Sequence, residues 1–150
     1  MDFHPTRPFA YIVNELDSTI CVCRIEASGS LRQIQIVPTI PCPDSSNTCA
    51  QILCHSNGKY VYCSNRGHDS IACFKVSDVD GSLSLIANQD SQGRTPRNFS
   101  ITSNGRYMVI ANQDTDDMYS MAINNDGSLS GPVSSLNVPN PSCVCFTRSE

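Results

Sequence analysis

The stretch YVYCSNRGHDSI, residues 60–71, decides the fold because it is the middle copy of a repeat. FAYIVNELDSTI at residues 9–20 precedes it, and YMVIANQDTDDM at residues 107–118 follows it. In each copy a short apolar run ends in asparagine, and these asparagines lie 51 and 47 residues apart. A period of about 45–50 residues that contains only strand and turn signals is typical of β-propeller blades.

The apolar runs read as β-strands because they are short, rich in β-branched and aromatic residues, and bounded by turn residues. Asn57-Gly58 and Asn104-Gly105 can adopt positive φ just before a strand, which is a strong hairpin signal, and Asp80-Gly81 and Asp126-Gly127 do the same one hairpin later. The runs are continuously apolar rather than alternating, which predicts sheets that are covered on both faces. No helix is predicted.

Each blade is predicted to contain four strands. The repeats cover about 4–48, 49–96 and 97–141, and a terminal strand follows at 142–147. The predicted strands of the second and third copies are about Cys49–His55, Lys59–Ser64, Ser70–Val76, Leu83–Asn88, Arg97–Thr102, Arg106–Ala111, Met118–Ile123 and Val133–Val138. The first copy lacks most of its first strand. The predicted fold class is therefore all-β, with about three propeller blades in an incomplete ring.

An incomplete ring leaves two blade faces and several strand edges without a partner. The terminal repeats carry no polar capping unit of the kind that closes stable repeat arrays. We therefore expect the chain to be a fragment of a longer protein, and we expect self-association through the open blade edges.

Composition narrows the class of protein. Ten basic and fourteen acidic residues, with a pI of about 5.2, argue against a nucleic-acid partner. The apolar runs are too short to span a membrane, and the first residues do not resemble a signal peptide, so we predict no membrane partner and a cytoplasmic location.

The chain contains nine cysteines, an odd number, and no Cys-x-x-Cys motif. Six lie in predicted strands and are expected to be structural free thiols, with disulfides or a metal site as the weaker alternatives: Cys21, Cys23, Cys63, Cys73, Cys143 and Cys145. No metal ligand set is predicted.

Polar residues follow the repeated asparagine in every copy. Glu15, Arg66 and Gln113 occupy equivalent positions, and His68 lies two residues beyond Arg66. Equivalent positions of successive blades lie at the same end of a propeller, so these side chains are expected around one mouth of the central channel. A carboxylate, a guanidinium and an imidazole there could act as base, anion clamp and oxyanion stabiliser. The alternative is that each is a solvated loop residue.

The asparagines themselves, Asn14, Asn65 and Asn112, are expected mainly to close a turn through hydrogen bonds to the backbone. Asn65 is also a candidate substrate-binding residue.

Three motifs carry a resemblance to a known family. SNRGHDSI at residues 64–71, NELDST at residues 14–19 and RTPRNF at residues 94–99 resemble the seven-bladed propeller lactonase family, which includes bacterial-type 6-phosphogluconolactonase and fungal carboxymuconate cyclase. The likeness covers nearly the whole chain. It implies a seven-bladed ring, of which this chain would be the C-terminal portion.

The resemblance also implies a site and a reaction. Glu15, Arg66 and His68 match catalytic positions of the family, and Arg97 is similar to a substrate-facing arginine. The reaction would be hydrolysis of a phosphorylated sugar lactone, 6-phosphoglucono-1,5-lactone, to 6-phosphogluconate in the pentose phosphate pathway, without a metal or other cofactor. A carboxymuconate cyclase-type lyase and a non-catalytic binding module are the alternatives.

Overall fold

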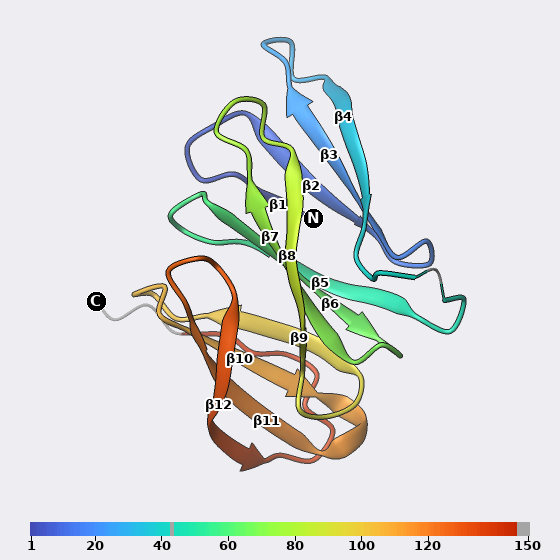
Figure 1. The fold of residues 1–150 in the computed structure, drawn as a ribbon, viewed down its shortest axis with the longest axis vertical. Helices are drawn as coiled ribbons and strands as arrows, with labels where there is room; N and C mark the ends of the chain where they lie inside the picture. The colour runs from blue at the N-terminus through green and yellow to red at the C-terminus, as the bar shows by residue number, and fades with distance from the viewer. Residues whose placement is uncertain (43, 147–150) are drawn as a thin grey trace.

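The computed structural model describes residues 1–42 and 44–146 and contains three four-stranded antiparallel sheets, arranged as a fan (Figure 1). Neighbours within each sheet are consecutive in the chain. The first sheet contains β1 (Asp2–Phe3), β2 (Phe9–Asn14), β3 (Thr19–Ile25) and β4 (Leu31–Pro38). The second contains β5 (Thr48–Cys54), β6 (Tyr60–Arg66), β7 (Ser70–Val76) and β8 (Leu83–Asp90). The third contains β9 (Pro96–Ile101), β10 (Tyr107–Asn112), β11 (Asp117–Ile123) and β12 (Leu129–Asn137).

This architecture confirms the predicted fold class: the sheets are three blades of an open propeller. The first strands of the second and third blades, β5 and β9, contact each other, and β1 contacts β5. The inner edges of the blades therefore lie together, and β4, β8 and β12 form the outer edges (Figure 1).

The middle blade explains why the strands are continuously apolar. Successive residues of a strand point to opposite faces, and both faces of this blade are covered. Val61 packs in the core shared with the first blade, while Tyr60 and Tyr62 pack in the core shared with the third. On β7, Phe74 packs in the core shared with the first blade, and Cys73 packs in the core shared with the third. One run of residues thus supplies two cores.

The recurring Gly-Ser-Leu is a hairpin turn between the third and fourth strands of each blade. Asp80 Oδ1 accepts hydrogen bonds from the Ser82 hydroxyl at 2.7 Å and from the Ser82 amide at 3.1 Å. The bond from the Ser82 hydroxyl, a bond with the Ser77 side chain and the bond from the Ser82 amide lower the pKa of Asp80 to about 2. Asp126 and Ser128 repeat the arrangement in the third blade.

Two predicted strands are corrected by the structure. β12 begins at Leu129, four residues before the predicted Val133, because a bulge opposite Ser120–Ala122 lets the strand pass through Gly131 and Pro132. Residues 142–146 form no strand, and residue 147 lies outside the described residues. Val144 donates its backbone N–H to the Asn98 side chain at 2.8 Å rather than to a neighbouring backbone, so no ladder forms.

A short 3₁₀ helix, Gln113–Thr115, also interrupts the predicted all-strand pattern. All nine cysteines are free thiols. Cys63 and Cys73 are fully buried in the blade cores, as expected, whereas Cys143 and Cys145 are exposed because their segment is not a strand. Among the described residues, no helix has the length and apolar character that crossing a membrane requires.

Candidate functional site

Glu15 and Arg66 occupy the same position in neighbouring blades and meet at one end of the sheets. Glu15 directly follows β2, and Arg66 is the last residue of β6. Arg66 Nη2 donates to Glu15 Oε1 in an ion pair, and it also donates to the backbone carbonyl of Cys49 at 2.8 Å. The Arg66 side chain is 16% exposed and that of Glu15 61%. The guanidinium is therefore held in the blade junction, while the carboxylate reaches water.

Arg97, from β9 of the third blade, joins this pair. A cavity of about 220 Å³ is lined by Glu15, Arg66, Arg97, Ala50 and Ser142. The structure thus brings three of the predicted site residues, one from each blade, to a single cavity. It presents two guanidinium groups and one carboxylate, which suits an anionic ligand with a site for proton transfer beside it.

His68 and Gln113 do not line this cavity. His68 lies in the exposed turn between β6 and β7, where its Nδ1 is 2.8 Å from the Ser70 hydroxyl and its backbone N–H donates to Asn47 Oδ1 at 3.0 Å. Gln113 is drawn into the 3₁₀ helix, whose first backbone N–H donates to the Thr95 carbonyl. An equivalent position in the repeat therefore did not bring Gln113 to the cavity.

Asn65 is fully buried and does not line the cavity. Its amide donates to the Thr39 carbonyl at 3.2 Å and to the Ser70 hydroxyl at 3.3 Å. Asn14 and Asn112 make the same link to the residue five positions later, Thr19 and Asp117. The repeated asparagine therefore ties the end of one strand to the start of the next. This is a structural role and leaves Asn65 no surface for substrate.

The cavity contains two residues that the sequence did not indicate. Ala50 lies on the innermost strand β5, and Ser142 comes from the segment that follows β12. Neither position carries a repeat or motif signal. In addition, Arg66 Nε is buried and has no hydrogen-bond partner among the described residues. Buried donors are rarely left unpaired, so this atom marks Arg66 as a functional candidate.

A buried thiol lies behind Arg66. Cys49 is fully buried, and its Sγ is 3.3 Å from the Thr39 hydroxyl and 3.4 Å from Asn65 Oδ1. Hydrogen bonding with the Cys63 thiol is the largest of several influences that lower the pKa of Cys49, and the Arg66 charge adds to them. The same contact raises the pKa of Cys63.

Comparison with known proteins places this geometry in context. The family model "Lactonase, 7-bladed beta-propeller" matches residues 1–146. The 6-phosphogluconolactonase of Bacillus subtilis is 31% identical over 147 residues, which are 96% of this chain and 42% of that protein. The chain spans less than half the length of the curated relatives that it matches first.

Two solved structures share the fold closely. A protein from Lactobacillus plantarum superposes with a TM-score of 0.92 at 33% identity, over 97% of this chain and 43% of that one. The periplasmic gluconolactonase of Pseudomonas aeruginosa superposes with a TM-score of 0.85 at 28% identity, over 90% of this chain and 38% of that one. Together with the family model, these similarities show that the chain belongs to the seven-bladed β-propeller lactonase family.

Proposed function

We propose that the cavity of Glu15, Arg66 and Arg97 is part of the active site of a 6-phosphogluconolactonase-type lactone hydrolase, with 6-phosphoglucono-1,5-lactone as substrate. The observation that carries this proposal is the convergence of one carboxylate and two guanidinium groups from three blades on one cavity. Membership of the lactonase family and the likeness to the Bacillus subtilis enzyme support it.

Each of the three side chains has its own role in the proposed reaction. Arg66 and Glu15 are paired, so the reacting carbonyl belongs beside them. Glu15 Oε2, which the ion pair does not use, takes a proton from the attacking water, and Arg66 stabilises the negative charge that develops on the carbonyl oxygen. The bond from the carbonyl carbon to the ring oxygen then breaks, and the proton goes to that oxygen. The product is the open-chain acid.

Arg97 is assigned to the substrate phosphate. It is exposed and comes from the third blade, whereas the ion pair joins the first and second blades. A guanidinium binds phosphate oxygens with two parallel hydrogen bonds, which a hydroxyl group at the same place cannot match. Arg97 therefore determines whether a phosphorylated lactone is preferred.

The experiment compares hydrolysis of 6-phosphoglucono-1,5-lactone and glucono-1,5-lactone by the full-length protein that carries this segment, corrected for spontaneous ring opening. Arg97→Gln should lower kcat/KM for the phosphorylated lactone by about 10–100-fold and leave glucono-1,5-lactone nearly unchanged. Arg24→Gln is the matched control, because Arg24 is exposed on β3 and lines no part of the cavity. Equal loss on both lactones would contradict the phosphate assignment.

The Pseudomonas aeruginosa neighbour gives the second candidate, a gluconolactonase that acts on the unphosphorylated sugar lactone. A higher kcat/KM for glucono-1,5-lactone would favour it. Turnover of carboxymuconate without lactone hydrolysis would favour the cyclase, and binding without turnover would favour a non-catalytic module. The nine free thiols suit a reducing compartment, which supports a cytoplasmic location for the proposed enzyme.

A further inference from the structure

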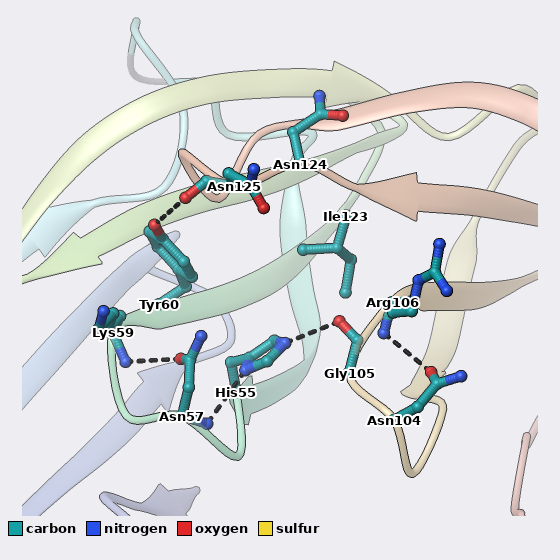
Figure 2. A pocket seen from close by; sticks show the side chains of 10 residues that line it. All are labelled: His55, Asn57, Lys59, Tyr60, Asn104, Gly105, Arg106, Ile123, Asn124 and Asn125. Carbon is teal, nitrogen blue, oxygen red and sulfur yellow. Dashed lines mark hydrogen bonds between the residues drawn. The ribbon is translucent and has the colours of Figure 1, made fainter.

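A second, larger cavity lies at the opposite end of the blades. β6 begins at Tyr60, which lines this cavity, and ends at Arg66, which lines the first one. Its volume is about 680 Å³, within the range of small-molecule sites. It is formed by three turns of the second and third blades and is lined by His55, Asn57, Lys59, Tyr60, Asn104, Gly105, Arg106, Ile123, Asn124 and Asn125 (Figure 2).

The charged residues of this cavity are all basic. Lys59 lies on one side and Arg106 on the other (Figure 2), and none of the ten described residues that line it is acidic. The chain as a whole carries a net charge of −4, so the lining of this cavity is opposite in sign to the chain average. Within residues 1–42 and 44–146, neither cation forms an ion pair. Both are exposed and can meet a ligand from solvent.

Two amide side chains add further donors. Asn57 Oδ1 accepts the backbone N–H of Lys59 at 2.8 Å, and Asn104 Oδ1 accepts that of Arg106 at 3.0 Å. Only the oxygen of an amide can accept these bonds, so the orientation of both side chains is fixed. Their NH₂ groups are left as donors. The polar surface is therefore rich in donors, which favours ligand oxygens over ligand cations.

Hydrogen bonds between the blades hold the three turns in place. His55 Nδ1 accepts the Asn57 backbone N–H at 3.1 Å, and Nε2 is 2.9 Å from the Gly105 carbonyl. The Tyr60 hydroxyl donates to the Asn125 carbonyl at 2.6 Å (Figure 2). A site fixed in this way loses little conformational entropy when it binds a ligand. The Tyr60 ring and Ile123 supply contact for a carbon skeleton.

We propose that this cavity binds a small polyhydroxylated organic anion that carries an acidic group at each end. Lys59 binds one acidic group, Arg106 binds the other, and the amides of Asn57 and Asn104 bind hydroxyl groups between them. The site lies within the second and third blades, so it does not depend on the lactone cavity at the other end.

Three compounds with the same six-carbon skeleton test the proposal by titration calorimetry: glucarate with two acidic groups, gluconate with one, and glucitol with none. Affinity should fall in that order, by about tenfold or more for each acidic group that is lost. Lys59→Gln and Arg106→Gln should each bring glucarate to the affinity of gluconate, and the double variant should bring it to that of glucitol.

Arg24→Gln removes the same charge from a site that lines no part of this cavity and should leave glucarate binding unchanged. Arg66→Gln tests whether glucarate binds at the other end of the blades. If this variant lost affinity for glucarate while the Lys59 and Arg106 variants bound it normally, the ligand would bind in the lactone cavity and the proposal would be overturned. Equal affinity for the three compounds, or no saturable binding of glucarate up to about 10 mM, would also overturn it.

Discussion

Tyr62 in the second blade donates a hydrogen bond of 3.0 Å from its hydroxyl to the backbone carbonyl of Gly127 in the third. One blade earlier, Tyr11 makes the same bond to Gly81 at 3.3 Å. Both tyrosines are fully buried, and both come from the same position of the repeat. In the third copy that position is Val109. The repeat therefore encodes a contact between blades in its first two copies, whereas the third copy has an apolar residue at that position.

Tyr62→Phe should destabilise the protein by about 1–3 kcal/mol, because it leaves the Gly127 carbonyl buried without this partner. Thermal and urea unfolding measure the loss. Tyr119→Phe is the control: Tyr119 is half-buried, and its hydroxyl has no hydrogen-bond partner among the described residues. If the two variants unfolded alike, the bond between blades would contribute nothing to stability.

Gly81→Ala should destabilise more than Gly29→Ala, although both glycines have positive φ, +77° and +84°. At Gly81 a Cβ atom would lie 2.7 Å from the Phe9 ring of the neighbouring blade, whereas at Gly29 it would meet nothing within 4 Å. Backbone strain alone costs about 1–2 kcal/mol at each site, and the clash adds about 1–3 kcal/mol at Gly81. Equal urea midpoints for the two variants would mean that the interface between the blades accommodates the added methyl group without a loss of stability.

The strand pattern could be predicted from the sequence because it depends on local composition and on turn residues. The predicted Ser70–Val76 is β7 as observed, and the asparagine-glycine pairs are hairpin turns. The cavity of Glu15, Arg66 and Arg97 was partly predictable for the same reason. Equivalent positions in the repeat lie at the same end of the blades.

The direction of a side chain could not be predicted in this way. Asn65 and Arg66 are adjacent, but successive side chains of a strand point in opposite directions. Asn65 therefore lies in the buried turn, whereas Arg66 lines the cavity. Ser142 reaches the site through tertiary contact alone. The second cavity was missed because Asn57 and Asn104 are standard turn residues, and their shared surface exists only when two blades pack together.

Acid should weaken the fold through His4. Burial, together with the nearby Arg7 charge, lowers the pKa of His4 from 6.5. The unfolded chain then binds more protons than the folded one between the lowered pKa and 6.5. The contribution of neutral His4 to the free energy of unfolding is fully present above pH 6.5. It is lost as the pH falls toward the pKa of His4 in the folded protein. The free energy of unfolding, measured from about pH 7.5 to about pH 5, should decline less in His4→Gln. If the free energy of unfolding declined equally in both proteins, His4 would not be the cause of the loss in acid.

The isolated 150-residue chain should self-associate through its open faces. Ile36 on the first blade and Leu136 on the third are both exposed, on faces that point away from the middle blade. Such faces attract each other. Light scattering after size-exclusion chromatography should give a mass above 16.3 kDa. Ile36→Glu with Leu136→Glu should shift it toward the monomer, whereas Val79→Glu, an exposed turn residue, should not.

The ion pair of Glu15 and Arg66 should matter far more for turnover than for stability. Glu15 is largely exposed, and exposed ion pairs contribute about 0–1 kcal/mol to folding. In the full-length protein, Glu15→Gln keeps the shape of the side chain but removes its basicity, so turnover of the lactone should fall about 10²–10³-fold with little change in melting temperature. Arg66→Lys keeps the charge but cannot form two parallel hydrogen bonds as a guanidinium does. Its turnover should therefore be only slightly higher than that of Arg66→Ala.

The exchanged pair, Glu15→Arg with Arg66→Glu, decides between the two roles. It retains opposite charges at the two positions but removes the hydrogen bond from Arg66 to the Cys49 carbonyl, so a purely structural pair would lose some stability and keep its turnover. A catalytic pair would lose its turnover, because the base and the oxyanion contact would then stand on the wrong sides of the lactone carbonyl. Lost turnover in an exchanged variant that still folds would assign both residues to the reaction. Normal turnover in the exchanged variant would reduce the ion pair to a link between two blades.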